Sequence, residues 1–133
     1  MTEKHHGSCL CGQVKFEIDG DFEHFFLCHC SHCRKDTGSA HAANLFCAAH
    51  QLTWLAGQDL VTTYQLPDTR HGKSFCRQCG SALPRLMGHQ VMVPAGALDS
   101  PLTLPPTAHL FMASRALWDH ELAQLKTYSG LPT

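Results

Sequence analysis

Residues 76–80 read Cys-Arg-Gln-Cys-Gly, and together with Cys9 and Cys11 this stretch decides how the chain folds. A Cys-x-x-Cys turn followed by glycine aims two sulfurs at one point, about 2.3 Å from each, where a zinc ion can bind. On extended chain, residues i and i+2 point to the same face, so Cys9 and Cys11 can chelate one ion. Cys9, Cys11, Cys76 and Cys79 therefore predict a closed tetrahedral site that ties the start of the chain to its later half, and the energy of metal binding would then be folding energy.

A second cluster, formed by Cys28, Cys30 and Cys33, supplies three sulfurs from one short stretch. Three thiolates leave one corner of a tetrahedron open, and an open corner is typical of a catalytic zinc site. Because three anionic sulfurs weaken the Lewis acidity of the ion, a zinc hydroxide is less expected here than at a site made of histidines. Such a zinc can still bind an incoming thiol and lower its pKa. The cluster thus indicates chemistry at a carbon–sulfur bond.

Several alternatives stay open from the residues alone. The triple could be closed by a histidine, and the candidates for a fourth ligand are His29, His32, His41 and His71. His29 and His32 could exchange protons with a substrate or could simply face solvent, and the same holds for Asp36. Cys47 stands alone and is expected to be a small buried residue. A single Cys-x-x-Cys could be a redox pair, but two pairs and a triple together favour metal binding.

Composition indicates the cellular compartment and the redox state in which these cysteines are found. Eight cysteines among 133 residues indicate either disulfides in a secreted protein or metal and redox chemistry inside a cell. Residues 1–8 contain no apolar run of the kind a signal peptide needs, and no stretch approaches the roughly 18 apolar residues of a membrane helix. We therefore expect a cytoplasmic protein with reduced thiols and no membrane partner. The net charge of -1 provides no broad cationic surface, so a nucleic-acid partner is not expected.

Hydrophobic periodicity predicts a mainly β fold, a small zinc-stapled β-sheet domain with one or two short helices. Val14, Phe16 and Ile18 alternate with charged residues, as in a strand with one buried face. Further strands are predicted at residues 25–28, 42–46, 51–55, 60–65, 81–86, 90–94 and 109–113. The length fits one domain, so residues 1–133 are expected to form a single folding unit.

Helix is predicted in only two places. A short helix over residues 31–37 should end at Gly38, and residues 116–125 show helical spacing of Leu117, Leu122 and Leu125. Residues 100–106 carry three prolines and should form an extended connection. The pair His5-His6 fits a disordered start of the chain.

Five stretches taken together resemble a known family. They are Gly-Ser-Cys-Leu-Cys-Gly-Gln-Val at residues 7–14, Cys-His-Cys-Ser-His-Cys-Arg-Lys at 28–35 with Gly38-Ser39, Phe-Cys-Arg-Gln-Cys-Gly-Ser at 75–81, Ala-Gly-Ala-Leu-Asp at 95–99, and His109-Leu110-Phe111 with Trp118. In combination they resemble the glutathione-dependent formaldehyde-activating enzymes, a family that also includes the centromere protein V type of domain. The resemblance spans nearly the whole chain.

The resemblance implies a fold of β-sheets pinned by two zinc ions per chain. It implies that Cys9, Cys11, Cys76 and Cys79 hold a structural ion and that Cys28, Cys30 and Cys33 hold the catalytic one. The activity it implies is that of a zinc-dependent carbon–sulfur lyase acting on a glutathione-like thiol and a small aldehyde such as formaldehyde, an S-(hydroxymethyl)glutathione synthase-like enzyme. The candidate basic residues for binding the two carboxylates of glutathione are Arg34, Lys35, Arg70, Lys73 and Arg77. The alternative function is a zinc-stabilised binding or scaffold module, or a thiol-based sensor without turnover.

Overall fold

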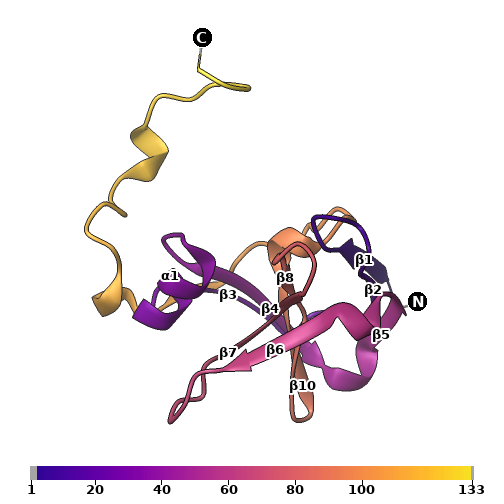
Figure 1. The fold of residues 1–133 in the computed structure, drawn as a ribbon. Coiled ribbons are helices and arrows are strands. Elements are labelled where there is room, and N and C mark those ends of the chain that lie inside the picture. Colours follow the sequence, from indigo (N-terminus) through magenta and orange to yellow (C-terminus); the bar gives the residue numbers. More distant parts are fainter. Residues whose placement is uncertain (1–2, 133) are drawn as a thin grey trace.

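The computed structural model describes residues 3–132, which form three β-sheets around a common core (Figure 1). The first sheet has the order β1-β2-β5, the second β11-β3-β4-β10-β9 and the third β6-β7-β8. The strands are β1 (Lys4–Ser8), β2 (Lys15–Asp19), β3 (His24–Cys28), β4 (Ala42–Ala48), β5 (Leu52–Ala56), β6 (Val61–Gln65), β7 (Gly72–Cys76), β8 (Ala82–Leu83), β9 (Arg85–Met87), β10 (Gln90–Pro94) and β11 (Ala108–Leu110). Neighbouring strands run antiparallel except β11 and β3, which are parallel. The fold is mainly β, as the sequence predicted.

Helical structure is short throughout the described residues. It comprises α1 (Ser31–Thr37) and the 3-10 turns η1 (Ala49–Gln51), η2 (Gln58–Leu60), η3 (Ala95–Ala97), η4 (Met112–Ser114) and η5 (Leu122–Gln124). None of these segments combines the length and apolar character that a membrane crossing requires.

The core lies between the sheets and consists of alternate residues of their strands. Phe16 and Ile18 of β2, Leu45 of β4 and Val91 and Val93 of β10 are fully buried. Full burial of such a side chain contributes about 1.5–3 kcal/mol of hydrophobic free energy. The cysteines Cys9, Cys47 and Cys76 belong to the same buried cluster, so the sulfur-bearing turns are attached directly to the core.

The structure adds β1 and β7 to the strands expected from the sequence. It also divides the strand predicted over residues 81–86 into β8 and β9, which belong to different sheets, with Pro84 between them where no ladder hydrogen bond can be donated. The prediction of disorder at His5-His6 is wrong, because both residues lie in β1 and pair with β2. His5 is buried and packs against Phe22, with ring centroids 4.9 Å apart. Pairing with residues of β2 that lie ten or more positions away orders His5 and His6, and the residues of β1 alone do not predict this pairing.

The helix predicted over residues 31–37 is confirmed as α1. Cys30 caps its N-terminus by accepting a hydrogen bond at 3.3 Å from the Cys33 backbone N–H. Gly38 ends the helix with φ of 65°, a left-handed conformation that costs glycine nothing. Helix α1 therefore begins and ends as its sequence dictates, and this fixes the spacing of Cys30 and Cys33.

The helix predicted over residues 116–125 is wrong. These residues form turns and η5, and Glu121 has a left-handed φ of 50°. Ala116 is buried, but the large apolar side chains cover no core, since Leu117 is 100% exposed and Leu125 is 63% exposed. An isolated helix of this length is marginal without a packed face, and in Figure 1 the yellow segment runs away from the sheets.

Candidate metal centres and the adjoining pocket

The four cysteines predicted to form a closed site lie on two turns that face each other. Cys9 and Cys11 lie in the turn from β1 to β2, and Cys76 and Cys79 lie at the end of β7 and in the turn to β8. All four sulfurs fall within 4.8 Å of one another. The Sγ atoms of Cys9 and Cys11 are 3.5 Å apart, and those of Cys11 and Cys76 are 4.0 Å apart. Sulfurs around one tetrahedral zinc would be about 3.8 Å apart, so this donor set fits zinc.

Local backbone geometry holds these sulfurs in place. The N–H of Gly80 donates to the carbonyl of Cys76 at 2.7 Å, and Gly80 has φ of 76°, which closes the Cys-x-x-Cys turn. The expectation that Cys9 and Cys11 lie on extended chain is wrong, because Cys11 lies in a turn that the Gly12 N–H closes on the carbonyl of Cys9 at 3.0 Å. The two sulfurs converge because of this turn and not because of strand alternation.

Hydrogen bonding favours the thiolate form of Cys79 and Cys9 in this four-sulfur cluster. A hydrogen bond from the backbone N–H of Ser81 is the main cause that lowers the pKa of Cys79 to about 6. For Cys9, burial opposes ionisation, but the N–H of Val14, which donates to its sulfur at 3.3 Å, and the thiols of Cys11 and Cys76 lower the pKa overall. At Cys11 a hydrogen bond from the backbone of Gln13 acts in the same direction, but burial and the neighbouring thiols outweigh it and raise the pKa to about 11. Metal binding requires deprotonated sulfur, so these backbone donors prepare the cluster for a cation.

The three remaining clustered cysteines lie where β3 passes into α1. Cys28 ends β3, Cys30 caps α1 and Cys33 lies in its first turn. Their sulfurs lie within 4.8 Å of one another, and in the part of the chain that the structure describes no histidine, aspartate or glutamate joins this group. Burial opposes ionisation of Cys30, but hydrogen bonds from the Cys33 N–H and the neighbouring thiols lower its pKa, whereas burial raises the pKa of Cys33. Three soft donors on one side fit a zinc ion with a remaining coordination position.

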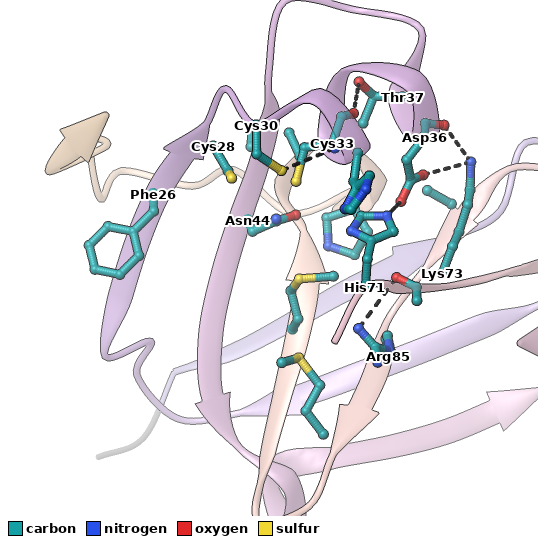
Figure 2. Close-up of a pocket in the computed structure, with 18 of the residues that line it drawn as sticks. Phe26, Cys28, Cys30, Cys33, Asp36, Thr37, Asn44, His71, Lys73 and Arg85 are labelled. Carbon is teal, nitrogen blue, oxygen red and sulfur yellow. Dashed lines mark hydrogen bonds and ion pairs between the residues drawn. The ribbon is translucent and has the colours of Figure 1, made fainter. Parts of the chain in front are cut away.

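A pocket of about 490 Å³ opens beside these three cysteines (Figure 2). Its walls come from α1, from strands β3, β4 and β7 to β11, and from the segment around His71, and they are mostly apolar. The apolar wall residues are Phe26, Ala42, Ala43, Phe46, Ala82, Leu83, Met87, Met92, Pro94, Leu110 and Phe111. The charged or imidazole residues are His32, Asp36, Arg70, His71, Lys73 and Arg85. A pocket that combines apolar walls with a few convergent polar groups is the usual form of a small-molecule site.

The polar side of the pocket is organised around Asp36 on α1. Its Oδ2 lies 2.8 Å from Nε2 of His71, and its Oδ1 lies 3.0 Å from Nζ of Lys73. The ring of His71 in turn lies 5.5 Å from that of His32, centroid to centroid. Figure 2 shows this group facing the same pocket as the three sulfurs. Asp36 and His71 are far apart in the sequence, so no spacing motif could reveal the pair.

The structure separates the two histidines of the cysteine-rich stretch. His32 is exposed and lines the pocket, whereas His29 is only 1% exposed and is absent from the pocket wall. Burial, followed by the nearby His41, lowers the pKa of His29. His29 therefore fits neither sequence-based interpretation, since it faces neither the pocket nor solvent.

Cys47 lies apart from both cysteine clusters and is fully buried in β4. Burial, with a smaller contribution from the charge of Glu23, raises its pKa to about 11. The expectation that Cys47 is a small core residue is confirmed.

A known protein family resembles this chain over the part of the sequence that carries the two cysteine clusters. The family model described as "Glutathione-dependent formaldehyde-activating enzyme" matches residues 4–114, which include all seven clustered cysteines. The chain belongs to this family. A curated protein of Halomonas elongata named "Putative glutathione-dependent formaldehyde-activating enzyme" is 35% identical over 127 residues, covering 84% of this chain and 77% of that protein.

A solved structure also matches the fold of this formaldehyde-activating enzyme family member. A crystal structure of a Rhodobacter sphaeroides protein superposes with a TM-score of 0.61 at 23% identity, covering 78% of this chain and 98% of that chain. At this level of identity the likeness concerns the fold alone. The resemblance drawn from the cysteine-containing stretches is confirmed by the family match.

Of the basic residues suggested for a glutathione carboxylate, Arg70 and Lys73 line the pocket, and Arg34, Lys35 and Arg77 are not among the wall residues. Arg85 was missed by the sequence analysis. It reaches the pocket from β9 and donates to the side-chain oxygen of Gln65 at 3.0 Å. Only the pairing of β9 with β10 brings it there.

Proposed function

We propose that this protein is a zinc-dependent carbon–sulfur lyase that joins a glutathione-like thiol to a small aldehyde such as formaldehyde, or cleaves the S-hydroxymethyl adduct. The observation that carries the proposal is the group of three sulfurs beside a pocket, with no fourth protein ligand in residues 3–132. Membership of the family supports the same substrates.

We assign the metal ligands on the same grounds. Cys9, Cys11, Cys76 and Cys79 would hold a structural zinc, and Cys28, Cys30 and Cys33 would hold the zinc of the reaction, two ions per chain in these sites. A zinc ion held by these three cysteines would supply a binding position for the substrate thiol and would lower the pKa of that thiol, so that its sulfur would be a nucleophile at neutral pH.

The protein's own residues would position the substrates and move the proton. The apolar wall of the pocket excludes water from the reacting atoms, and Arg70 and Arg85 attract the carboxylates of the thiol substrate. Asp36 accepts a hydrogen bond from Nε2 of His71, which leaves the lone pair on Nδ1. His71 can then take the proton that the thiol loses and return it to the carbonyl oxygen as the carbon–sulfur bond forms. No oxidant is needed, because the product is a hemithioacetal.

We further propose that the chain works as one domain over residues 1–133, in the cytoplasm, on small molecules and not on nucleic acid. The even distribution of basic residues and the net charge of -1 support this choice of partner.

The decisive experiment measures the rate of adduct formation by nuclear magnetic resonance with glutathione and formaldehyde. Because formaldehyde adds to thiols without a catalyst, wild type is compared with protein-free buffer and with Cys30→Ser. Wild type should exceed both, and metal analysis should find that Cys30→Ser has lost the ion of the triple. A wild-type rate equal to that of Cys30→Ser, with metal in place, would contradict the proposal.

A further inference from the structure

A third group of side chains that could hold a metal ion includes a residue next to the cysteine triple in sequence and lies outside the wall of the pocket. It consists of His29, His41, His109 and Asp119, and we call it the His29 cluster. His29 lies between two cysteines of the triple, His41 directly precedes β4, His109 belongs to β11 and Asp119 lies in the C-terminal segment. Four separate parts of the chain therefore meet at one point, where His29 is buried, His41 and Asp119 are half-buried and His109 is exposed. Asp119 lies beyond the residues that the family model matches.

Distances within the His29 cluster are those of ligands around one ion. Ligand atoms of His29, His41 and Asp119 lie within 4.8 Å of one another. Nδ1 of His29 is 3.2 Å from Oδ2 of Asp119. Two such ligands on a tetrahedral zinc, each about 2.0–2.1 Å from it, would be about 3.3 Å apart. His29 and Asp119 already have this separation.

Two ring nitrogens of the cluster are buried without a hydrogen bond. They are Nδ1 of His29 and Nδ1 of His41. Although Nδ1 of His29 is near Asp119, the two atoms do not have the alignment of a hydrogen bond. Buried polar atoms are rarely left unpartnered, and a cation shared with the carboxylate of Asp119 would give Nδ1 of His29 a partner. His29 itself is 1% exposed.

The other nitrogen of His29 has a partner that sets the tautomer required of a ligand. Nε2 of His29 lies 2.9 Å from Nδ1 of His109. If Nε2 carries the proton and donates it to His109, the lone pair of His29 lies on Nδ1 and faces Asp119. A histidine that binds a metal commonly donates its second N–H to a neighbouring acceptor in this way. His109 would thus orient His29 without touching the ion.

We propose that His29, His41 and Asp119 form a third metal site, which takes a divalent transition cation such as zinc and joins the C-terminal segment to the loop of the cysteine triple. Two imidazoles and a carboxylate are a donor set that suits zinc. Apart from Ala116, the neighbours of Asp119 are largely exposed, with Leu117 at 100% and Trp118 at 62%. Metal binding at Asp119 would therefore fix a segment that packs little by itself.

Cobalt(II) titration of the full-length protein tests this site separately from the thiolate sites. Cobalt bound by thiolates shows sulfur-to-metal charge-transfer absorption, whereas cobalt bound by imidazole and carboxylate does not. Wild type should bind about one equivalent more than Asp119→Asn and His41→Gln, and that equivalent should lack the charge-transfer band. His120→Ala, next to Asp119 but outside the cluster, is the matched control and should bind as wild type does.

A second readout follows the C-terminal segment directly. Trypsin should cut after Arg115 several-fold more slowly in metal-loaded wild type than in metal-loaded Asp119→Asn. Equal metal content in wild type and in both variants would overturn the proposal, because the nitrogens would then be partnered by water or by a shared proton. The difference between wild type and variant does not depend on how many ions the cysteines hold, so failure here leaves the proposed activity untouched.

Discussion

Replacing Cys76 by serine should lower the unfolding temperature about 15 °C further than replacing Cys47 by serine. Both cysteines are fully buried in the core, so both substitutions bury a hydroxyl in place of a thiol. Only Cys76 belongs to a sulfur cluster, and it lies 65 residues from Cys11, its neighbour in that cluster. The comparison therefore separates the metal crosslink from the cost of the buried hydroxyl.

The magnitude follows from the length of the loop that the metal closes. Closing a loop of about 65 residues removes roughly 4 kcal/mol of entropy from the unfolded chain at 25 °C, by the relation used for disulfides. Serine is not a zinc ligand, so Cys76→Ser should lose this contribution. A domain of this size has an unfolding entropy of about 0.28 kcal/mol per degree at its midpoint. Dividing the lost free energy of roughly 4 kcal/mol by this entropy gives a shift of about 15 °C in the unfolding temperature.

Cys30→Ser provides the contrast within the same experiment. The triple spans a short segment that α1 already orders, and serine is a favoured N-cap that can accept the hydrogen bond from the Cys33 N–H. Cys30→Ser should therefore melt within about 3 °C of wild type. The assay is thermal unfolding of zinc-loaded protein by circular dichroism, with metal content measured on the same samples. If Cys76→Ser melts no lower than Cys47→Ser, or if Cys30→Ser is equally damaging, the division between a structural and a reactive cluster is wrong.

Three further predictions concern the pocket, the core thiol and one glycine. His71→Asn and Asp36→Asn should each reduce the rate of adduct formation, measured by nuclear magnetic resonance, about 100-fold or more at unchanged metal content. Rates near that of wild type would show that this pair does not transfer the proton. Because its pKa is raised to about 11, Cys47 should stay a thiol at pH 8 and resist alkylation until urea unfolds the chain, as mass spectrometry can show; rapid labelling of folded protein would refute this. Gly57→Ala should destabilise the fold by about 1–3 kcal/mol and reduce zinc content, since its Cβ would lie 2.2 Å from the carbonyl oxygen of Gln13 in the turn after Cys11. Gly96→Ala, which meets no atom within 4 Å, is the control, and equal melting of the two variants would exclude a steric cause.

Much of the grouping of the cysteines could be predicted from the sequence. The partition of seven cysteines into a set of four and a set of three followed from their spacing, and the structure brings the same sets together. Helix α1 was predictable with both ends, because Gly38 and the N-cap position act within a few residues of the helix itself. Strands such as β2 were predictable because a half-buried strand alternates in its own sequence.

Other features depended on partners far along the chain. The helix expected at residues 116–125 failed because helical spacing stabilises a helix only when its apolar face meets a core, and Leu117 and Leu125 meet none. Strand β1 was taken for a disordered start because its own residues are polar, and its pairing with β2 is what orders it.

The sequence by itself therefore determined the separate units, the two cysteine pairs and the triple, since each of them lies within a few residues of chain. The joining of the two pairs needs the fold, because Cys11 and Cys76 are 65 residues apart. Tertiary structure alone decided what surrounds those sulfurs. Asp36 meets His71 and His29 meets Asp119 only because sheets and turns bring distant segments into contact. Side chains that are close in the sequence can be grouped from their spacing along the chain. The contacts that form the pocket and the His29 cluster arise only from the packing of distant segments.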